Sequence, residues 1–271
     1  MERAIRTDIP ARISARSLLV GPRWAANTLW AALGIGLFVL LWTAIALRLA
    51  NPVLLPTPAV VLEGFYRLLA DGYLVNDVLA SLKRVFVGFM MAAAVGVPLA
   101  MVLAYFLPLR RLVLPVVTLL RPIPPIAWIP IAILWFGIGD KPSFFITAIA
   151  AFFPIFLNSF FGGMSVEEQH LNAARSLGAK KASLVVRIMF PSALPMIWTG
   201  LKIGLGQSWM AVVTAELIAA QSGLGYMIQM SRLNLETSYV LVGMVVIGVL
   251  GSLMGAALSS VERYVLPWKS K

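Results

Sequence analysis

The sequence predicts an all-α integral membrane protein of about six transmembrane helices. Of its 271 residues, 60% are hydrophobic and only 12% are charged, and the mean hydropathy is +0.90. Soluble domains have about twice that share of charged residues. The apolar residues also gather in runs long enough to cross a hydrocarbon core of about 30 Å. These runs are 28–47, 85–107, 112–138, 143–161, 194–220 and 239–258.

The runs and the polar segments between them divide the chain into five parts. The predicted parts are an inner N-terminal segment (1–27), a first transmembrane helix (28–50), an external segment (51–84), a membrane core (85–262) and an inner tail (263–271). The N-terminal segment is polar and rich in arginine. Because the apolar run after it is longer than a signal-peptide core and lacks a small-residue cleavage site, we expect a retained helix.

The external segment begins with a proline-rich stretch, Leu54-Leu55-Pro56-Thr57-Pro58, that cannot continue a helix. Residues 59–70 then place apolar side chains at helical spacing opposite Glu63 and Arg67. This pattern predicts a short amphipathic helix along the membrane surface.

The third long run contains the sequence Arg121-Pro122-Ile123-Pro124-Pro125. Prolines free backbone carbonyls, and a membrane helix tolerates this only where neighbouring helices or water satisfy them. The sequence therefore predicts a broken or kinked helix packed against protein.

Basic residues indicate the orientation, because cytoplasmic loops are enriched in Lys and Arg. With the N-terminus inside and six crossings, the inner segments hold 14 basic residues and the outer segments hold 6, Lys83 and Arg84 among them. We therefore expect both termini in the cytoplasm.

The longest inner loop, residues 163–191, is too polar to cross a membrane. Ser165 and Glu168 have the spacing of a capping box, which predicts a helix that runs to Leu177. Gly178 would supply the left-handed turn that ends it. A second helix is predicted to lead to Pro191. A helix, a Gly turn and a second helix have a shape that fits a groove on a partner.

Several functions are excluded or disfavoured by composition. The chain has no Cys and a single His, His170, which excludes Cys-ligated metals, thiolate catalysis and disulfides, and disfavours a histidine triad. The net charge of +11 would suit nucleic acid, but the basic residues lie between apolar runs and form no stripe. We expect no catalytic residues, no metal site and no nucleic-acid binding.

The loop resembles the coupling loop of bacterial ABC importer permeases. The pattern of that family is Glu-Ala-Ala, three residues, Gly, nine residues, Ile, any residue, Leu, Pro. Ala173-Ala174, Gly178, Ile188 and Pro191 match it, whereas Asn172 stands in place of the Glu and Phe190 in place of the Leu. The Asn leaves no charge for a contact there, but the turn is unaffected.

Two further stretches, RPIPPIAWIPIAILWFGIG (121–139) and TGLKIGLGQSWMAVVTAELIAAQSGLGYMI (199–228), are similar to permeases of the nitrate, sulfonate and taurine subfamily. The resemblance covers about residues 51–268. It implies a bundle like that of type I ABC importer permeases, multi-pass in a bacterial inner membrane, with the 163–191 loop in the cytoplasm.

The resemblance also implies partners. These are a second copy of the chain, two cytoplasmic ATP-binding subunits and a periplasmic or lipid-anchored substrate-binding protein, all working in membrane lipid. ATP and Mg²⁺ would be bound by the ATPase subunits and no cofactor by this chain, which has no G-x-x-x-x-G-K-[ST] motif. The residues expected to contact the ATPase are Glu168, Asn172, Ala173, Ala174, Arg175, Leu177, Gly178 and Ala179.

Arg121 and Lys202 lie about 12–15 Å into their predicted spans. A charge at that depth costs at least about 2.5–3.5 kcal/mol, so it should face water or a partner. If both line the pathway, they favour a small anion. Alternatively, each reaches the membrane interface or pairs with a carboxylate. The residues expected along the pathway are Arg121, Pro122, Pro125, Lys202, Gln207, Trp209 and Glu216.

Lys202, Trp209 and Glu216 share one helical stripe, which is typical of a pore lining. Glu216 could equally be solvated near the outer end of its span, and no partner for it is evident in the sequence.

The favoured function is a non-catalytic permease subunit that forms the pathway for a small anion and is driven by separate ATPases. A secondary transporter would show an inverted repeat and a midplane acid, and an intramembrane enzyme would need paired carboxylates or a His/Ser constellation. The sequence leaves taurine, alkanesulfonates, nitrate and bicarbonate open, and a non-anionic pyrimidine precursor as well.

Overall fold

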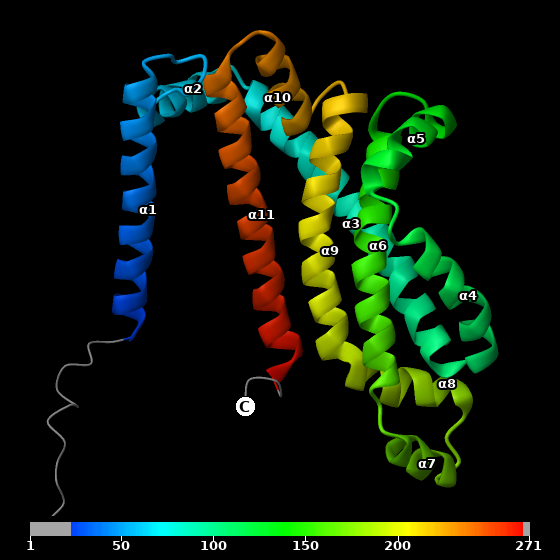
Figure 1. Cartoon of the computed structure of the whole chain (residues 1–271). Coiled ribbons are helices and arrows are strands. Elements are labelled where there is room, and N and C mark those ends of the chain that lie inside the picture. The colour runs from blue at the N-terminus through cyan, green and yellow to red at the C-terminus, as the bar shows by residue number, and fades with distance from the viewer. Residues whose placement is uncertain (1–22, 268–271) are drawn as a thin grey trace, which may run out of the picture. The chain divides into compact units, whose positions relative to one another are not determined.

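The structure, a computed structural model, describes residues 23–267, with side chains from Thr28 onwards. Most of the predicted inner segment 1–27 and the end of the tail 263–271 lie outside the described residues. Every regular element in the described range is helical, as predicted (Figure 1). In chain order these are α1 (Arg23–Leu49), α2 (Pro58–Ala70), α3 (Tyr73–Tyr105), α4 (Leu107–Leu120), the 3₁₀ turn η2 (Pro125–Trp128), α5 (Ile129–Phe136), α6 (Asp140–Met164), α7 (Glu168–Ser176), α8 (Lys181–Leu184), the π-helical turn η3 (Val185–Met189), α9 (Phe190–Ala219), α10 (Leu224–Leu233) and α11 (Thr237–Val265).

The chain forms two separate units. The first, up to Asn51, contributes α1, an apolar helix long enough to cross a membrane. The second begins at Pro52 and holds all the other elements.

Among the described residues, five helices are long and apolar enough to cross a membrane, and a bent pair of helices makes a sixth, broken span if the two are counted as one. The five are Thr28–Leu49, Tyr73–Tyr105, Asp140–Met164, Lys181–Ala219 and Thr237–Val265. The broken span joins Leu107–Leu120 to Pro125–Phe136 with a bend of 94°. The prolines prevent helical hydrogen bonding at the break, which confirms the predicted interruption of this span.

Helix α3 begins at Tyr73 and not near Val85, where the predicted span starts. Its first twelve residues include Asp77, Lys83 and Arg84, which lower the hydropathy of this stretch. Arg84 therefore lies inside a helix with 2% of its surface exposed, and not in an external loop.

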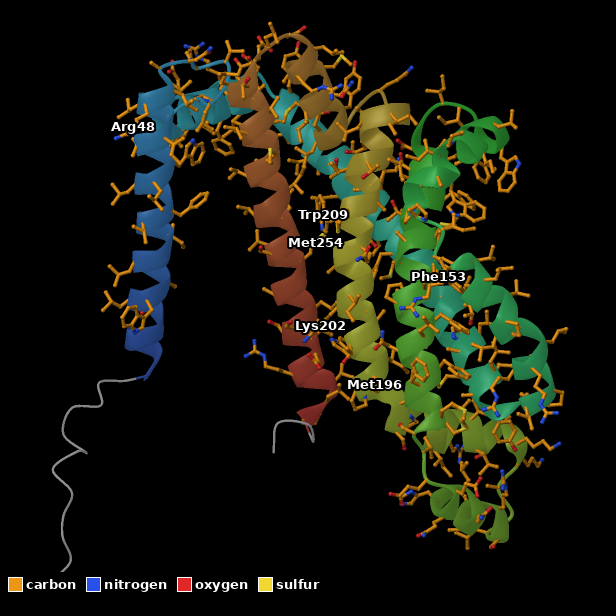
Figure 2. The ribbon with its side chains drawn as sticks, viewed as in Figure 1. Arg48, Phe153, Met196, Lys202, Trp209 and Met254 are labelled. Atoms are coloured by element: carbon orange, nitrogen blue, oxygen red, sulfur yellow. The ribbon has the colours of Figure 1, made fainter. Side chains whose placement is uncertain are left out.

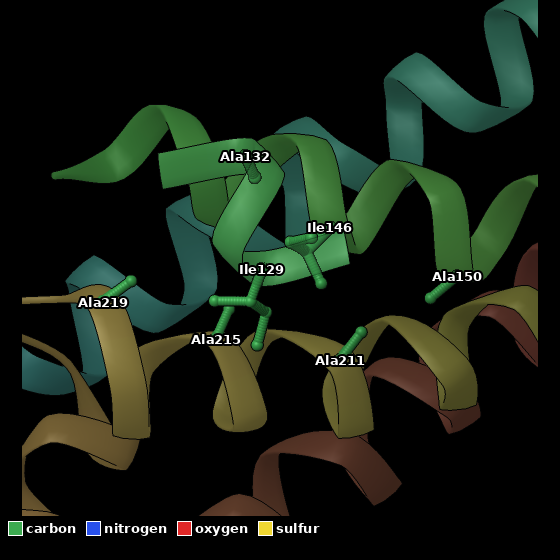
Figure 3. Close-up of a cluster of buried hydrophobic side chains, with 7 residues drawn as sticks. All are labelled: Ile129, Ala132, Ile146, Ala150, Ala211, Ala215 and Ala219. Carbon is green, nitrogen blue, oxygen red and sulfur yellow. The ribbon is translucent and has the colours of Figure 1, made fainter. Parts of the chain in front are cut away.

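The core of the second unit is formed where α6 packs against both α3 and α9. Glycines allow this close approach, because a Cβ on Gly204 would lie 2.7 Å from Ile155 Cγ1. Near one end of α9, alanines pack against Ile129 and Ile146 (Figure 3). This packing fixes η2 and the start of α5, the second half of the broken span, to α6 and α9.

The short helices gather at the two ends of α9. Helices α7 and α8 lie at its N-terminal end, and α10 follows its C-terminal end (Figure 1). The second unit therefore presents a polar helical element at one end and a turn into α10 at the other.

Candidate functional site

Helix α7 projects from the bundle without burying any of its residues. Leu177, at its C-terminal end, is 89% exposed. The only hydrogen bond recorded between its side chains is local, from Arg175 Nη1 to Asn172 Oδ1 at 2.9 Å. The surface of α7 is therefore largely open to solvent or to another protein.

The turn after α7 has the geometry predicted from Gly178. Its φ is +81°, and the N–H groups of Gly178 and Ala179 donate to the carbonyls of Arg175 and Ala174 at 2.9 and 3.0 Å. These two bonds form a Schellman motif, which favours glycine because a Cβ is strained at this φ. No atom lies within 4 Å of the position of a Cβ at Gly178, so only the backbone angle restricts this residue.

The predicted capping box at Ser165 is wrong. Helix α7 begins at Glu168, after Glu167, and no side chain caps it. Ser165 ends the preceding helix α6, where its hydroxyl donates to the carbonyl of Gly162 at 2.8 Å. Because α6 runs into the loop further than the sequence indicated, the hydroxyl has an acceptor nearer than α7.

The predicted second helix of the loop is not a separate element. It is α8, which continues through the π-helical turn η3 into α9 to give one uninterrupted helix from Lys181 to Ala219, which we call the rod and which bends near the junction of α8 and α9 (Figure 1). We call α7, the Gly178 turn and α8 together the α7–α8 knob. The knob is therefore attached directly to a membrane-spanning helix.

A cavity of about 410 Å³ lies beside the break in the sixth span. Its polar side chains are Arg121, Asn158 and Gln207, from the break, α6 and α9. Its apolar lining residues include Pro125 and Phe153, of which Phe153 is labelled in Figure 2. The cavity is thus large enough for a small solute and has one positive charge and two amides.

Arg121 is exposed, and its side chain forms no hydrogen bond or ion pair with any residue that the structure describes. An unpaired guanidinium in an apolar span needs water or an anion beside it. Asn158 is half-buried, and its Nδ2 donates to the carbonyl of Pro154 at 2.8 Å.

The predicted pathway residues fall into three groups. Arg121, Pro125 and Gln207 line the cavity, whereas Pro122 borders a separate hollow beside α4. Lys202, Trp209 and Glu216 line neither.

Lys202 forms an ion pair with Glu262 of α11. Of the alternatives that the sequence left open for this lysine, the structure shows the one in which it pairs with a carboxylate. Trp209 is 5% exposed and packs against α11 at Gly251 (Figure 2). Lys202 and Trp209 therefore both face α11 of the same chain.

Glu216 has partners that the sequence did not reveal. It is 1% exposed, and it accepts hydrogen bonds from Arg84 Nη1 at 2.8 Å and from Ser81 Oγ at 2.8 and 2.9 Å. The expectation of a solvated or unpartnered acid is therefore wrong. A signal was present, because Asp77, Ser81 and Arg84 are spaced by four and three residues and so share one face of α3.

The comparisons with known proteins agree with this architecture. Residues 96–271 match the family described as "Binding-protein-dependent transport system inner membrane component". The chain is 36% identical over 232 residues to the taurine transport system permease protein of Escherichia coli (strain K12), with 84% of each chain covered. It is 33% identical over 226 residues to a nitrate import permease protein of Synechocystis, covering 80% of this chain and 82% of the relative.

The fold is also found among solved structures. Inward-facing structures of the MetNI methionine ABC transporter include a chain that matches with a TM-score of 0.62 at 21% identity, covering 69% of this chain and 93% of that one. This match confirms the predicted bundle of the type I importer kind.

Proposed function

Because the chain belongs to the family of binding-protein-dependent transport inner-membrane components, and within it to the nitrate, sulfonate and taurine group, we propose that it is the permease subunit of an importer driven by separate ATPase subunits. The resemblance noted in the sequence is thereby confirmed. The solute we propose is a small anion. The observation that most supports ATP-driven coupling is the exposed α7–α8 knob.

The knob has the features of an element that receives a force from a partner protein and transmits it to the membrane-spanning helices. No residue of α7 is fully buried and only Leu171 and Ala174 are half-buried, so most of its surface is free to enter a groove on another protein. Its position is nevertheless fixed, because the Gly178 turn joins it to α8 and α8 is continuous with α9. A force on α7 would therefore be transmitted to a membrane-spanning helix. The proposed ATPase contacts are Glu168, Asn172, Ala173, Ala174, Arg175, Leu177, Gly178 and Ala179.

The remaining partners follow from the proposed assembly. Two copies of this chain would span the membrane, two ATPase subunits would dock on the two knobs in the cytoplasm, and an external binding protein would deliver the solute. Both termini would then lie in the cytoplasm. ATP and Mg²⁺ would be bound by the ATPase subunits.

An anionic solute is supported by the cavity beside the break. Arg121 contributes its positive charge, and Asn158 and Gln207 offer amide groups, while apolar side chains complete the lining. Taurine and nitrate, named for two relatives, each present oxygen atoms of an anionic group. A guanidinium with two free edges suits such oxygens.

The acid that the sequence places within an apolar run is engaged, which disfavours the secondary-transporter alternative. Proton or sodium coupling usually needs an acid within the spans, and Glu216 is held by Arg84 and Ser81.

The importer is tested with Gly178→Val in the complex of this chain, its ATPase and its binding protein. The valine would force a β-branched side chain into a left-handed angle, at a cost of about 1–2 kcal/mol, and would displace α7. We expect ATP hydrolysis stimulated by the binding protein, and uptake into vesicles, to fall about tenfold or more.

Gly72→Val is the matched control. Gly72 has φ +75°, also has nothing within 4 Å of a Cβ position, and lies between α2 and α3, away from the knob. It should retain stimulated hydrolysis. Equal activities of both variants would contradict a coupling role for the knob, and a wild-type complex without ATP-dependent uptake would contradict the importer itself.

A further inference from the structure

We infer that Arg84 and Glu216 are positioning residues for energy coupling. They hold the end of α9 that is remote from the α7–α8 knob, so that a displacement of the knob moves α3, α6 and α9 as one body. This inference rests on the proposed importer function, which gives the knob its motor.

Arg84 is fully engaged inside the protein. Nε donates to Asp140 Oδ1 at 2.9 Å, and Nη2 donates to the same oxygen at 2.6 Å and to Ser222 Oγ at 3.0 Å. Nη1 donates to Glu216 Oε1 at 2.8 Å and to the carbonyl of Ser222 at 2.6 Å. The five donors of the planar guanidinium thus connect α3 to the start of α6, the end of α9 and the turn after α9.

Besides pairing with Arg84, Glu216 holds the turn between α9 and α10 in place. Its Oε2 accepts the backbone N–H of Gly225 at 2.9 Å. A Cβ at Gly225 would lie 2.7 Å from Glu216 Cβ, so this close approach requires glycine. Ser81 Oγ accepts the N–H of Leu224 at 2.9 Å, and Asp77 Oδ1 accepts that of Gly223 at 2.7 Å. The last turn of α9 and the first turn of α10 are therefore both held on the face of α3.

The buried Arg84–Glu216 pair, which we call the anchor, holds one end of the rod, and the knob is attached to the other end. Lys181 begins it beside the Gly178 turn, and Glu216 lies one turn from its end at Ala219. At about 1.5 Å per residue, about 50 Å of helix separates the two. Between them, α9 packs closely on α6, because a Cβ on Gly200 would lie 2.9 Å from Asn158 Cβ and 3.0 Å from the carbonyl of Pro154.

Burial makes this connection rigid. Removing one member of a buried, hydrogen-bonded ion pair leaves an uncompensated charge, whereas an exposed pair contributes little. The side chains of Arg84 and Glu216 are 2% and 0% exposed, whereas those of the Arg67–Glu63 pair on α2 are 66% and 60% exposed. Since α9 cannot slide past α3 and α6 without breaking the buried pair, a push on the knob is converted into movement of the three helices together.

The test measures how many ATP molecules are hydrolysed per solute imported by the complete importer in lipid vesicles. Solute uptake and ATP hydrolysis are measured in the same vesicles for Arg84→Lys, Glu216→Gln and Ser81→Ala. Lys keeps a charge but cannot bridge three elements, and Gln keeps the shape of Glu216 without its charge. We expect the ATP hydrolysed per solute imported to rise about fivefold or more for the charge variants, and less for Ser81→Ala.

Arg67→Gln on the exposed pair is the matched control and should leave the ratio unchanged. A merely structural role would lower uptake and hydrolysis together, in proportion to the folded complex, with a constant ratio. That result overturns the inference. Ser81→Ala removes no charge, so the complex with this variant should assemble even if the complexes with the charge variants do not. An unchanged number of ATP hydrolysed per solute imported in Ser81→Ala also contradicts the anchor.

The experiment distinguishes a failure of the proposed importer function from a failure of the anchor proposal. Absence of ATP-dependent uptake in the wild-type complex would reject the proposed function. Normal wild-type uptake with a constant ratio in the variants would reject only the anchor.

Discussion

Arg84 Nη1 lies 2.8 Å from Glu216 Oε1, although 132 residues separate the two in the chain. The pair closes the contact between α3 and α9 at the end of the bundle that leads into α10. Its burial implies a large and non-additive contribution to stability, because each charge is desolvated only in the presence of the other.

Arg84→Met should lower the free energy of unfolding by about 3–5 kcal/mol, because it leaves Glu216 buried without its cation. The double variant Arg84→Met/Glu216→Met should lose less than the sum of the single changes, by about 1 kcal/mol or more. Thermal unfolding of the purified chain in detergent, followed by tryptophan fluorescence, measures this. Simple additivity would show that the two side chains do not interact as the structure indicates.

Gly200→Ala should destabilise the chain by about 1–3 kcal/mol, because the added Cβ enters the α6–α9 contact. Gly206→Ala on the same helix meets no atom within 4 Å and should be neutral or stabilising, since alanine favours helix. The same unfolding measurement compares them. Similar losses from both would contradict the close packing of α9 on α6.

Arg121→Gln should reduce anion uptake about tenfold or more, because the cavity loses its only positive charge, while the binding protein still stimulates ATP hydrolysis. Arg121→Lys should retain part of the uptake, since it keeps the charge but not the planar donors. Lys202→Gln/Glu262→Gln is the control, because it removes a charge pair that does not line the cavity. Normal uptake by Arg121→Gln would exclude this residue from the solute's route.

Gln207→Glu should raise the KM for uptake about tenfold or more, because a carboxylate in the cavity offsets Arg121 and repels an anion. Gln207 is exposed on α9, so this change should leave unfolding unaffected. Gln207→Met is the neutral control for loss of the amide. If the Glu variant imported the anion with the KM of the wild type, the cavity would not be the place where the solute's charge is held.

Local features of this fold could be predicted from the sequence. The three prolines between 122 and 125 predict a broken span, because together they remove several backbone donors within one turn, whereas single prolines such as Pro98 and Pro154 lie inside helices. Gly178 predicts the turn after α7, since the left-handed angle follows from residue type and position. The apolar runs predict the spans themselves, although α3 begins well before its run does.

Partnerships across the bundle could not be predicted in this way. Glu216 and Lys202 share a stripe in the sequence, yet one meets Arg84 of α3 and the other meets Glu262 of α11. Periodicity gives the direction of a side chain on its helix, but the neighbour depends on tertiary packing. For the same reason the sequence did not identify Asn158, an isolated amide in an apolar run whose place in the cavity depends on how α6 meets the break.

The continuity of α8, η3 and α9 has a consequence for sequence length. In a helix each residue advances the rotation about the axis by about 100°. One residue inserted or deleted between Lys181 and Phe190 would therefore rotate α7 about the helix axis, so that it points in a different direction. The short connection from Ser165 to Glu167 could absorb such a change. Viable variants of this protein should accordingly differ in length before α7 and hardly ever within the rod.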